Sequence, residues 1–477
     1  MTARRIALAL ALLTILAPSG CRAVQRVPPT EIGRPTATPT IPPLPSRTPS
    51  PVTSPTRPTS TATTTTPTRE AARATSTATP TAAAGTTDTP TPTPTATRPT
   101  STATSTAAAT TEPAPTLTLT PPPAARVTRV VPPPGAMRLP LGFGVSVFAQ
   151  GLRGPRMLAL GPDGHIYVAE RGAGRIVRLP DRDGDGVADR IEVVADGLDA
   201  PSSIAFYLDG TLYVGETTRV LRFSAPDREG IYRERETVID GLPGREGHST
   251  RTVTCSPDGS ELYVSVGSSC NVCIERDARR AAILRFAPDG SGAEVYATGL
   301  RNAVGITFRP GTGELWATAN GRDWLGDDLP PETVYVLRQG DDAGWPRCHA
   351  GRIEDPDYGG PGSCDGVAVP AVEMQAHSAP LGLTFYTGDQ FPEEYRGDLY
   401  VAFHGSWNRS VPTGYKVVRI AIDDGTPGPA QDFVTGWLSE NGSVWGRPVD
   451  VLTGADGSLY VSDDGEGRIY RVFFQGD

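Results

Sequence analysis

The sequence predicts an all-β protein, a six-bladed β-propeller that follows a signal peptide and a disordered Thr/Pro-rich stalk. Two observations predict this fold class. A pattern of apolar strand, Asp-Gly-type turn and second apolar strand occurs six times after residue 142, mostly at a spacing of about 45–60 residues, as in four-stranded propeller blades. Every aromatic residue also follows residue 142, so a large core is possible only in the C-terminal part of the chain.

The six copies share an alternating run before the turn and an apolar run after it. Asp-Gly between two such runs is the strongest short-range signal of a β-hairpin. A single hairpin cannot bury its own face, so six copies are expected to pack around a central channel. A β-sandwich with coincidental turns gives no reason for six similar copies. The copies are Met157–Val168, Ser203–Val214, Thr252–Val264, Val304–Ala317, Leu381–Val401 and Pro448–Val461.

Residues 1–20 have the organisation of a secretory signal peptide. Arg4 and Arg5 precede the apolar stretch Ile6–Leu16, which is too short to anchor a helix in a bilayer. The small residues before Cys21 resemble a lipoprotein cleavage site, which predicts a lipid on Cys21. Ordinary secretion is the alternative, since Pro18 departs from that pattern. We therefore expect an exported protein on the extracellular face, with Cys21 as its only membrane contact.

Residues 21–134 form a Thr/Pro/Ala-rich tract, with TPTPTPT at residues 89–95. Such a tract has too little apolar surface to offset the entropy lost on ordering, and its prolines favour extended conformations. It is predicted to be a stalk before a propeller domain of residues 135–477. The net charge of −9 comes from the propeller, because the stalk is basic. An acidic domain is a poor partner for nucleic acid, which favours basic surfaces.

Cysteines are permitted to pair in an exported domain. A zinc site at the CxxC would need further ligands at matching spacing, and covalent haem attachment would need histidine in place of Ile274. Cys255 remains as an unpaired thiol. The two predicted disulfides are Cys270–Cys273 and Cys348–Cys364.

Residues 181–192, DRDGDGVADRIE, fit the pattern of a calcium-binding loop without a mismatch. Oxygen ligands at alternate positions and a glutamate at position 12 surround a hard cation, and Gly186 permits the sharp turn. A metal-free acidic hairpin loop is the alternative. The predicted ligands are Asp181, Asp183, Asp185, Val187, Asp189 and Glu192.

A second group of polar residues is dispersed along the chain, each just before or just after a blade strand. The short loops of several blades converge on one face of a propeller, so these residues are expected to meet there. A single histidine is more often structural than catalytic, and only their shared placement suggests a site. The group comprises His248, Arg301, Asn302, Gly344–Pro346, His377, His404–Arg409 and Arg447.

Several of these segments resemble the glucose/sorbosone dehydrogenases, six-bladed propellers that use pyrroloquinoline quinone (PQQ). The similarity covers roughly residues 140–475 and is closest to the L-sorbosone-dehydrogenase-like branch. It rests most strongly on AHSAPLGLTFYTG, VAFHGSWNRSVPTGYKVVRI and GRPVDVLTGADGSLYVSDDGEGRIYRV, at residues 376–388, 401–420 and 446–472.

The resemblance implies roles for individual residues. His248 matches the general base that deprotonates the sugar hydroxyl, and the carbonyls of Gly344 and Pro346 match ligands of the calcium ion beside the cofactor. Arginine forks suit the carboxylates of PQQ, and an imidazole suits a base at neutral pH. The positions implied to contact PQQ are Arg301, Asn302, His404, Asn408, Arg409, Lys416 and Arg447.

These features together predict a PQQ- and calcium-dependent oxidoreductase that acts outside the cell on the CH–OH or aldehyde group of an aldose- or sorbosone-like sugar. A separate electron acceptor is expected, because the chain has no haem, flavin or iron–sulfur motif. Two alternatives belong to other classes. One is a non-catalytic propeller that binds carbohydrate or protein; the other is a calcium-dependent sugar lactonase, which would need carboxylates in the channel.

Overall fold

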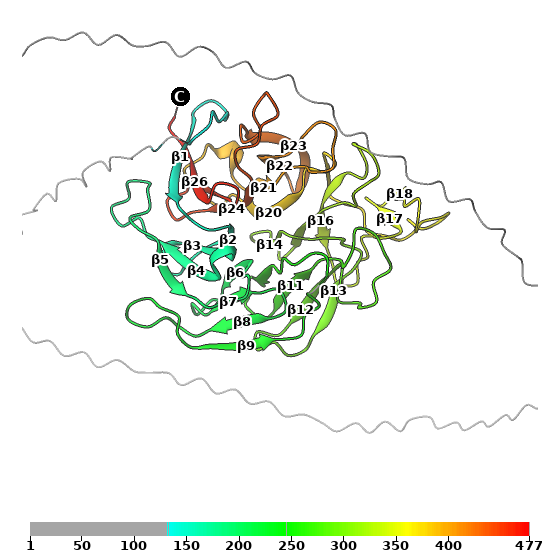
Figure 1. Cartoon of the computed structure of the whole chain (residues 1–477), viewed down its shortest axis with the longest axis horizontal. Helices are drawn as coiled ribbons and strands as arrows, with labels where there is room; N and C mark the ends of the chain where they lie inside the picture. The colour runs from blue at the N-terminus through cyan, green and yellow to red at the C-terminus, as the bar shows by residue number, and fades with distance from the viewer. Residues whose placement is uncertain (1–130, 132, 245, 477) are drawn as a thin grey trace, which may run out of the picture. The chain divides into compact units, whose positions relative to one another are not determined.

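Four-stranded antiparallel sheets make up most of the computed structural model, which describes residues 131, 133–244 and 246–476. The predicted signal peptide, Cys21 and nearly all of the predicted stalk lie outside the described residues. Six sheets surround a central axis (Figure 1), so the predicted six-bladed propeller is confirmed. Within the described part of the chain, no helix is long and apolar enough to cross a membrane.

The first five blades follow one another along the chain, each with its first strand nearest the axis. Blade 1 consists of β2 (Pro155–Leu160), β3 (Ile166–Glu170), β4 (Arg175–Leu179) and β5 (Glu192–Ala195). Blade 2 consists of β6 (Ser203–Phe206), β7 (Leu212–Gly215), β8 (Val220–Phe223) and β9 (Arg235–Ile239). Blade 3 consists of β10 (Val253–Cys255), β11 (Leu262–Val266), β12 (Ala282–Phe286) and β13 (Glu294–Ala297).

Blades 4 and 5 carry the larger insertions. Blade 4 consists of β14 (Ile306–Phe308), β15 (Leu315–Ala319), β16 (Glu332–Leu337) and β19 (Val372–Met374). Blade 5 consists of β20 (Pro380–Phe385), β21 (Leu399–Phe403), β22 (Lys416–Asp423) and β23 (Thr426–Val434). The short elements outside the blades are the ribbon β17 (Cys348–His349) with β18 (Ile353–Glu354), and the 3-10 helices η1 (Arg171–Ala173) and η2 (Glu393–Tyr395).

The sixth blade joins the two ends of the domain. Its outer strand β1 (Phe143–Gln150) pairs antiparallel with β26 (Arg468–Phe474), so that Phe143 lies opposite Phe474 and Gln150 opposite Arg468. The inner strands β25 (Leu459–Asp463) and β24 (Pro448–Thr453) complete the sheet. Pairing between the first and last strands closes the ring of blades.

Apolar side chains fill the contacts between neighbouring blades. Tyr167 and Ile204 belong to the cluster between blades 1 and 2, and Tyr400 and Trp437 to the cluster between blades 5 and 6. Trp437 is completely buried. Burial of this surface is the main stabilising contribution to the ring, because a single blade cannot bury both of its faces.

Antiparallel pairing gives the propeller two distinct faces. The turns between the first and second strands lie on one, which we call the turn face; Gly164 and Gly457 take left-handed φ values of 78° and 77° there, as tight hairpin turns require. The connections that enter each first strand lie on the opposite one, the loop face. In blade 1 Pro155 is paired with Glu170, so residues after a second strand also lie on the loop face.

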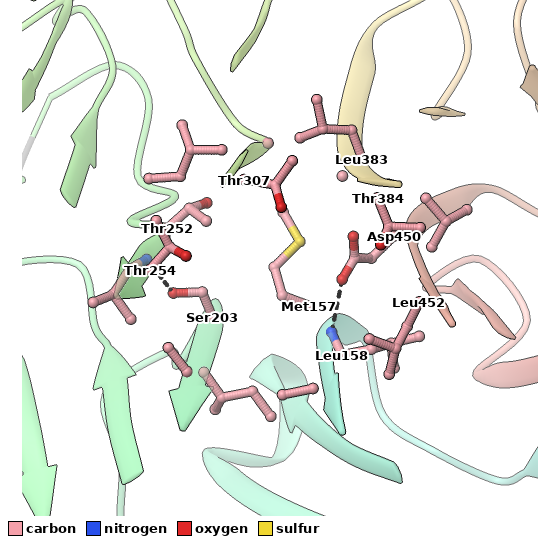
Figure 2. A pocket seen from close by; sticks show the side chains of 18 of the residues that line it. Met157, Leu158, Ser203, Thr252, Thr254, Thr307, Leu383, Thr384, Asp450 and Leu452 are labelled. Atoms are coloured by element: carbon pink, nitrogen blue, oxygen red, sulfur yellow. Dashed lines mark hydrogen bonds between the residues drawn. The ribbon is translucent and has the colours of Figure 1, made fainter. Parts of the chain in front are cut away.

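The first strands surround a central cavity of about 270 Å³ (Figure 2). The Ser203 hydroxyl donates to the Arg251 carbonyl of the next blade at 2.8 Å. Asp450 Oδ2 accepts the Leu158 amide at 2.8 Å, which ties blade 6 to blade 1, and burial raises the pKa of Asp450 to about 7. Every blade contributes residues of its first strand, or the residue just before it, to the cavity lining, among them Met157, Ser203, Thr252, Gly305, Gly382 and Asp450.

Candidate functional site

The structure places the dispersed polar residues on the loop face, as expected from their positions at strand ends. Another histidine, His165, lies instead in the turn between β2 and β3, on the turn face. The loop-face residues come from four blade entries and one strand exit: His248 before β10, Arg301 and Asn302 before β14, His377 before β20, His404 and Arg409 after β21, and Arg447 before β24.

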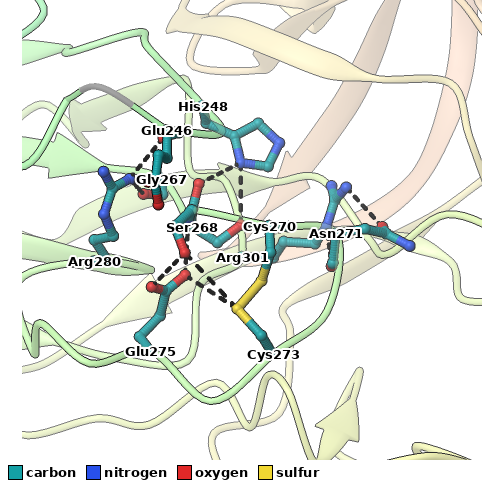
Figure 3. Close-up of a disulfide and its surroundings, with 11 residues drawn as sticks. Glu246, His248, Gly267, Ser268, Cys270, Asn271, Cys273, Glu275, Arg280 and Arg301 are labelled. Carbon is teal, nitrogen blue, oxygen red and sulfur yellow. Dashed lines mark hydrogen bonds between the residues drawn. A yellow bond between two sulfur atoms is a disulfide. The ribbon is translucent and has the colours of Figure 1, made fainter.

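His248 has one ring nitrogen engaged and the other available (Figure 3). Its Nδ1 lies 3.0 Å from the carbonyl oxygen of Ser268 and 3.1 Å from the Oγ of the same residue. A carbonyl can only accept, so Nδ1 carries the proton and Nε2 keeps its lone pair. Burial, reinforced by the nearby Arg301 guanidinium, lowers the pKa of His248 to about 4. The ring is therefore neutral near pH 7 and can accept a proton.

Two neighbours fix the position of His248. The buried Arg251 guanidinium donates to the carbonyls of His248 at 3.1 Å and Thr250 at 2.6 Å. A Cβ on Gly267 would lie 2.6 Å from the His248 Cβ and 2.6 Å from the Asn302 Oδ1. Only glycine fits between them, so the fold brings His248 and Asn302 together at position 267.

Arg301 lies beside His248 and is 7% exposed. Its Nε and Nη2 donate to the carbonyl and Oδ1 of Asn271 at 2.8 and 2.9 Å (Figure 3). Nη2 also pairs with Asp323 at 2.9 Å. The guanidinium is thus held in one orientation, with its charge partly balanced by the Asp323 carboxylate.

His404 belongs to a charged network formed by blades 5, 6 and 1. Its Nε2 lies 2.8 Å from Asp464 Oδ1, and Asp464 Oδ2 pairs with Arg156 at 2.7 Å. Because a carboxylate accepts, the His404 Nε2 carries its proton and does not serve as a base. Arg447 donates to the carbonyls of His404 and Gly405 at 3.3 and 3.5 Å.

Arg156, Arg171 and Asp464 lie on the same face but were not predicted from the sequence. Arg171, His404 and Asp464 each directly follow the second strand of a blade. An alignment of the repeats extended by three residues would have placed them at the same position. Arg156 lies inside β2, where the sequence gives no sign that its side chain reaches a carboxylate of another blade.

The remaining residues predicted to contact the cofactor, Asn408, Arg409 and Lys416, have different surroundings. Both polar atoms of the Asn408 side chain and Nε of Arg409 are buried and have no hydrogen-bond partner among the described residues. Arg409 Nη2 pairs with Asp328 at 3.1 Å. The Lys416 ammonium pairs with Asp432 on the outer strand β23, although the ladder places Val418 opposite Asp432. The prediction for Lys416 is corrected: it points away from the axis and leaves the site.

The Gly344–Pro346 turn packs beside the entry to β14, where the Trp345 amide donates to the Gly299 carbonyl at 3.1 Å. The Gly344 carbonyl accepts the amides of Arg347 and Cys348, both at 2.9 Å. A carbonyl oxygen offers two lone pairs, and here both are used inside the turn. The arrangement therefore does not favour the predicted role of Gly344 as a calcium ligand, and Pro346 is buried in the same turn.

Positive charge is concentrated around His248. Burial lowers the pKa of Arg251 to about 10, with Arg280 and Arg171 acting in the same direction. Burial and the charge of Arg156 also lower the pKa of Arg171. Like charges that lower one another's pKa create a region of positive potential. An otherwise acidic domain thus presents a site suited to an anion.

The predicted calcium loop lies on the turn face, between β4 and β5. Carboxylate oxygens of Asp181, Asp183 and Asp185 lie within 4.8 Å of one another. Burial raises the pKa of Asp181, and its Oδ2 accepts the Gly186 amide at 2.9 Å. Three of the predicted ligands are therefore gathered.

The last two predicted ligands, Asp189 and Glu192, are bound by arginines instead. Asp189 accepts the amide of Arg182 at 3.2 Å. Glu192 lies in β5, opposite Arg178 in the ladder, and its ion pairs outweigh the effect of burial and lower its pKa to about 2. Its partners are Arg178 at 2.6 Å, Arg182 at 2.8 Å and Arg190 at 2.5 Å. The predicted twelve-position loop is wrong at these ligands, because cross-strand pairing takes the glutamate.

Both predicted disulfides are present. Cys348–Cys364 closes the insertion between β16 and β19, and Cys270–Cys273 lies in the loop that follows β11. Cys255 is the free cysteine of the described part, and burial raises the pKa of its thiol to about 12. A thiol with that pKa is a weak nucleophile at neutral pH.

Comparisons with known proteins agree with this architecture. An uncharacterized protein of Borreliella burgdorferi is 36% identical over 232 residues, which are 48% of this chain and 61% of that protein. The pyrroloquinoline quinone-dependent pyranose dehydrogenase of Coprinopsis cinerea is 28% identical over 405 residues, 70% of this chain and 54% of the enzyme. The chain thus spans little more than half the length of these curated relatives.

Two further matches concern the propeller itself. The solved holo PQQ domain of the Coprinopsis pyranose dehydrogenase has a TM-score of 0.63 and 26% identity, over 73% of this chain and 99% of that domain. The resemblance to PQQ-dependent sugar dehydrogenases is thereby confirmed. A family model described as a domain of unknown function, DUF7133, matches residues 135–464. The chain therefore belongs to the DUF7133 family, and its propeller is similar to the PQQ domain of a pyranose dehydrogenase.

Proposed function

We propose that the loop face oxidises a CH–OH or aldehyde group of a sugar with PQQ as the cofactor. One observation carries this proposal: a neutral His248 with an available Nε2 lies beside the buried Arg301 in a region of positive potential. The similarity to an enzyme named as a PQQ-dependent pyranose dehydrogenase supports the same cofactor and substrate class. Within that class, an aldose or a sorbosone-like aldehyde is the expected substrate.

The residues of the loop face fit PQQ, a planar quinone with three carboxylates. Guanidinium groups bind carboxylates through two parallel hydrogen bonds. Several buried side-chain groups have no hydrogen-bond partner in the described part of the chain: Nε of Arg156, Nε of Arg409 and the side-chain amide of Asn408. Unpaired buried donors cost free energy, and an anionic ligand would offset that cost. The residues that would hold the cofactor are Arg156, Arg301, Asn408, Arg409 and Arg447.

The chain's own residues supply the proton chemistry, while PQQ supplies the two-electron acceptor. His248 Nε2 takes the proton of the hydroxyl that is oxidised. The Nδ1–H bond to Ser268 keeps the ring oriented during this step. The nearby Arg301 charge disfavours the imidazolium that forms, so the proton passes on to solvent and the base is restored.

Two exposed tryptophans on the loop face suit a sugar. Trp324 precedes β16 and Trp407 follows β21; they are 66% and 65% exposed. Their ring centroids lie 5.1 Å apart, with planes at 85°. Indoles combine a broad apolar face with a polar N–H, which matches the C–H face and hydroxyls of a pyranose ring.

Trp407→Ala is expected to raise KM for the sugar about tenfold with little change in kcat. The indole contributes to the ground state and the transition state alike, so its loss weakens binding without slowing chemistry. Steady-state kinetics with saturating PQQ measure both constants. Leu208→Ala, at a side chain 73% exposed on the turn face, is the control. A lower kcat with unchanged KM would contradict a binding role for Trp407.

We also propose that Asp181, Asp183 and Asp185 hold a structural calcium ion. Calcium should raise the melting temperature, because binding to the folded state alone adds about 2.7 kcal/mol at a hundredfold excess over the Kd. Asp183→Asn should remove this response. Glu192→Gln is the control, since that side chain is bound by arginines and should leave the calcium response intact. A melting temperature indifferent to chelator would remove the proposal.

The alternatives predict different results in one reconstitution experiment. Purified protein is mixed with PQQ and calcium, and the absorbance of the bound quinone is followed as sugars and an artificial electron acceptor are added. A dehydrogenase bleaches the quinone, a lactonase hydrolyses lactones without it, and a binding propeller does neither. The lactonase is less favoured, because Asp450 is the one carboxylate among the described residues that line the central cavity.

Export and lipid attachment at Cys21 remain part of the proposal and rest on the sequence. Mass spectrometry of the mature N-terminus would distinguish a diacylated Cys21 from simple cleavage nearby. The natural electron acceptor is proposed to be a separate molecule.

A further inference from the structure

The Cys270–Cys273 disulfide lies in a loop that contacts both central residues of the site (Figure 3). The Ser268 hydroxyl donates to the Cys270 carbonyl at 2.6 Å and lies 3.1 Å from the His248 Nδ1. One short chain of polar contacts therefore connects the disulfide-closed ring to His248.

Asn271 lies inside the ring closed by the Cys270–Cys273 disulfide and fixes Arg301, the second central residue of the site. Its carbonyl and Oδ1 both accept from Arg301. The same Oδ1 accepts the Asp323 amide at 2.8 Å, and Nδ2 donates to the Asp323 carbonyl at 3.1 Å. The side chain has no freedom left, so the orientation of Arg301 depends on the geometry of the four-residue ring.

The two disulfides differ in their access to solvent. Cys348 is completely buried and its partner Cys364 is partly exposed, whereas Cys270 and Cys273 are both partly exposed. The adjoining Ile274 is 54% exposed, so nothing in the described structure covers this end of the ring. A dissolved thiol can approach Cys270–Cys273 from either cysteine without unfolding the domain, whereas it can approach Cys348–Cys364 only from Cys364.

A carboxylate beside the ring makes its two sulfur atoms unequal. Glu275 Oε1 lies 3.8 Å from the Cys273 Sγ, and the same side chain is fixed by the Ser269 amide and hydroxyl at 2.6 and 2.8 Å. A nearby negative charge disfavours a thiolate on Cys273. Cys270 is therefore the better leaving group when the disulfide is attacked.

We propose that Cys270–Cys273 is a thiol-exchange site whose redox state controls the placement of His248 and Arg301. One thiolate of a dithiol reductant attacks the Cys273 Sγ, the S–S bond breaks, and Cys270 leaves and takes up a proton. The second thiolate of the reductant attacks the mixed disulfide and releases Cys273 as a thiol. The protein gains two electrons and two protons, and the dithiol becomes a cyclic disulfide.

Opening the ring removes the constraint on the Cys270 carbonyl and on Asn271. Arg301 then loses its fixed acceptors, and His248 loses the Ser268 geometry that holds its ring. The effect on activity rests on the proposed function, whereas the effects on thiol reactivity and on the His248 ring do not. The disulfide thus positions the site and takes no part in the sugar chemistry.

The test begins with the full chain and graded dithiothreitol, followed by alkylation and peptide mapping. Cys270 and Cys273 should be labelled first, with Cys348–Cys364 intact. In that state the affinity for PQQ should fall at least tenfold, and the His248 pKa, followed by NMR of the imidazole, should rise towards 6.5. Reoxidation with glutathione disulfide should restore both.

Two variants complete the experiment. Cys270→Ser with Cys273→Ser should reproduce the reduced state, and Cys255→Ser, at the free thiol of the described part of the chain, should behave as the wild type. Unchanged PQQ affinity and unchanged His248 titration after selective reduction would overturn the inference, as would prior loss of Cys348–Cys364. If the oxidised protein binds no PQQ, the proposed function fails, and the imidazole titration alone decides this proposal. If the double variant does not fold, reduction of the wild type remains decisive.

Discussion

His248→Ala is expected to lower turnover by two to four orders of magnitude, the usual contribution of a positioned general base. PQQ affinity should change little, because the His248 Nδ1 is bound to Ser268 and the imidazole is not among the groups that would hold the cofactor. Single-turnover reduction of bound quinone by sugar measures the effect. His165→Ala, on the turn face, is the control. Near-normal turnover in His248→Ala with an inactive His377→Ala would move the base to another blade.

The same assignment fixes the pH dependence. The base must be unprotonated, so kcat/KM should stay level as pH falls from 8 to about 5 and then decline near pH 4, the pKa of the buried ring. An ordinary histidine would give an acid limb near 6.5. The free energy of unfolding should also fall at low pH. Between pH 6.5 and 4 the imidazole of the unfolded chain binds a proton, whereas the buried imidazole of the folded protein does not, so the folded state loses stability as pH drops through this interval.

Asp463→Ala is expected to be the most destabilising single change, at about 4 kcal/mol, because each abandoned buried donor costs about 1–3 kcal/mol. Asp463 is completely buried at the end of β25. It accepts the Trp437 indole N–H at 3.0 Å and the amides of Arg447, Gly465 and Glu466 at 2.8, 2.9 and 3.1 Å. Urea denaturation followed by fluorescence would measure the loss.

Trp437→Phe provides the matched control for Asp463. It keeps an aromatic ring in the cluster between blades 5 and 6 but removes the indole N–H that donates to Asp463 Oδ2, at an expected cost of about 1 kcal/mol. The Tyr470 hydroxyl still donates to the same oxygen at 3.3 Å. If Asp463→Ala costs no more than Trp437→Phe, the backbone amides at the entry to β24 do not depend on this carboxylate.

The number of blades could be predicted because each hairpin carries its own turn and its own apolar alternation. The shared face of His248, Arg301 and Arg447 was likewise predictable, since strand ends converge. Side-chain partners were not predictable in the same way. Arg156 meets Asp464 across 308 residues of sequence, and Glu192 turns to Arg178 because of ladder register. Both ion pairs depend on how strands distant in the sequence are placed beside each other, and the residue pattern within one strand does not determine that.

The pairing of β1 with β26 determines when the domain can be completed during synthesis. The ribosome releases β1 first, but its partner strand is among the last residues of the chain. Throughout the synthesis of five blades β1 therefore remains an unpaired edge, the kind of segment that promotes aggregation. A circular permutant that begins at β2 and carries β1 after β26 would present the strands of every blade in contiguous order, and each sheet could form as soon as its own residues emerge.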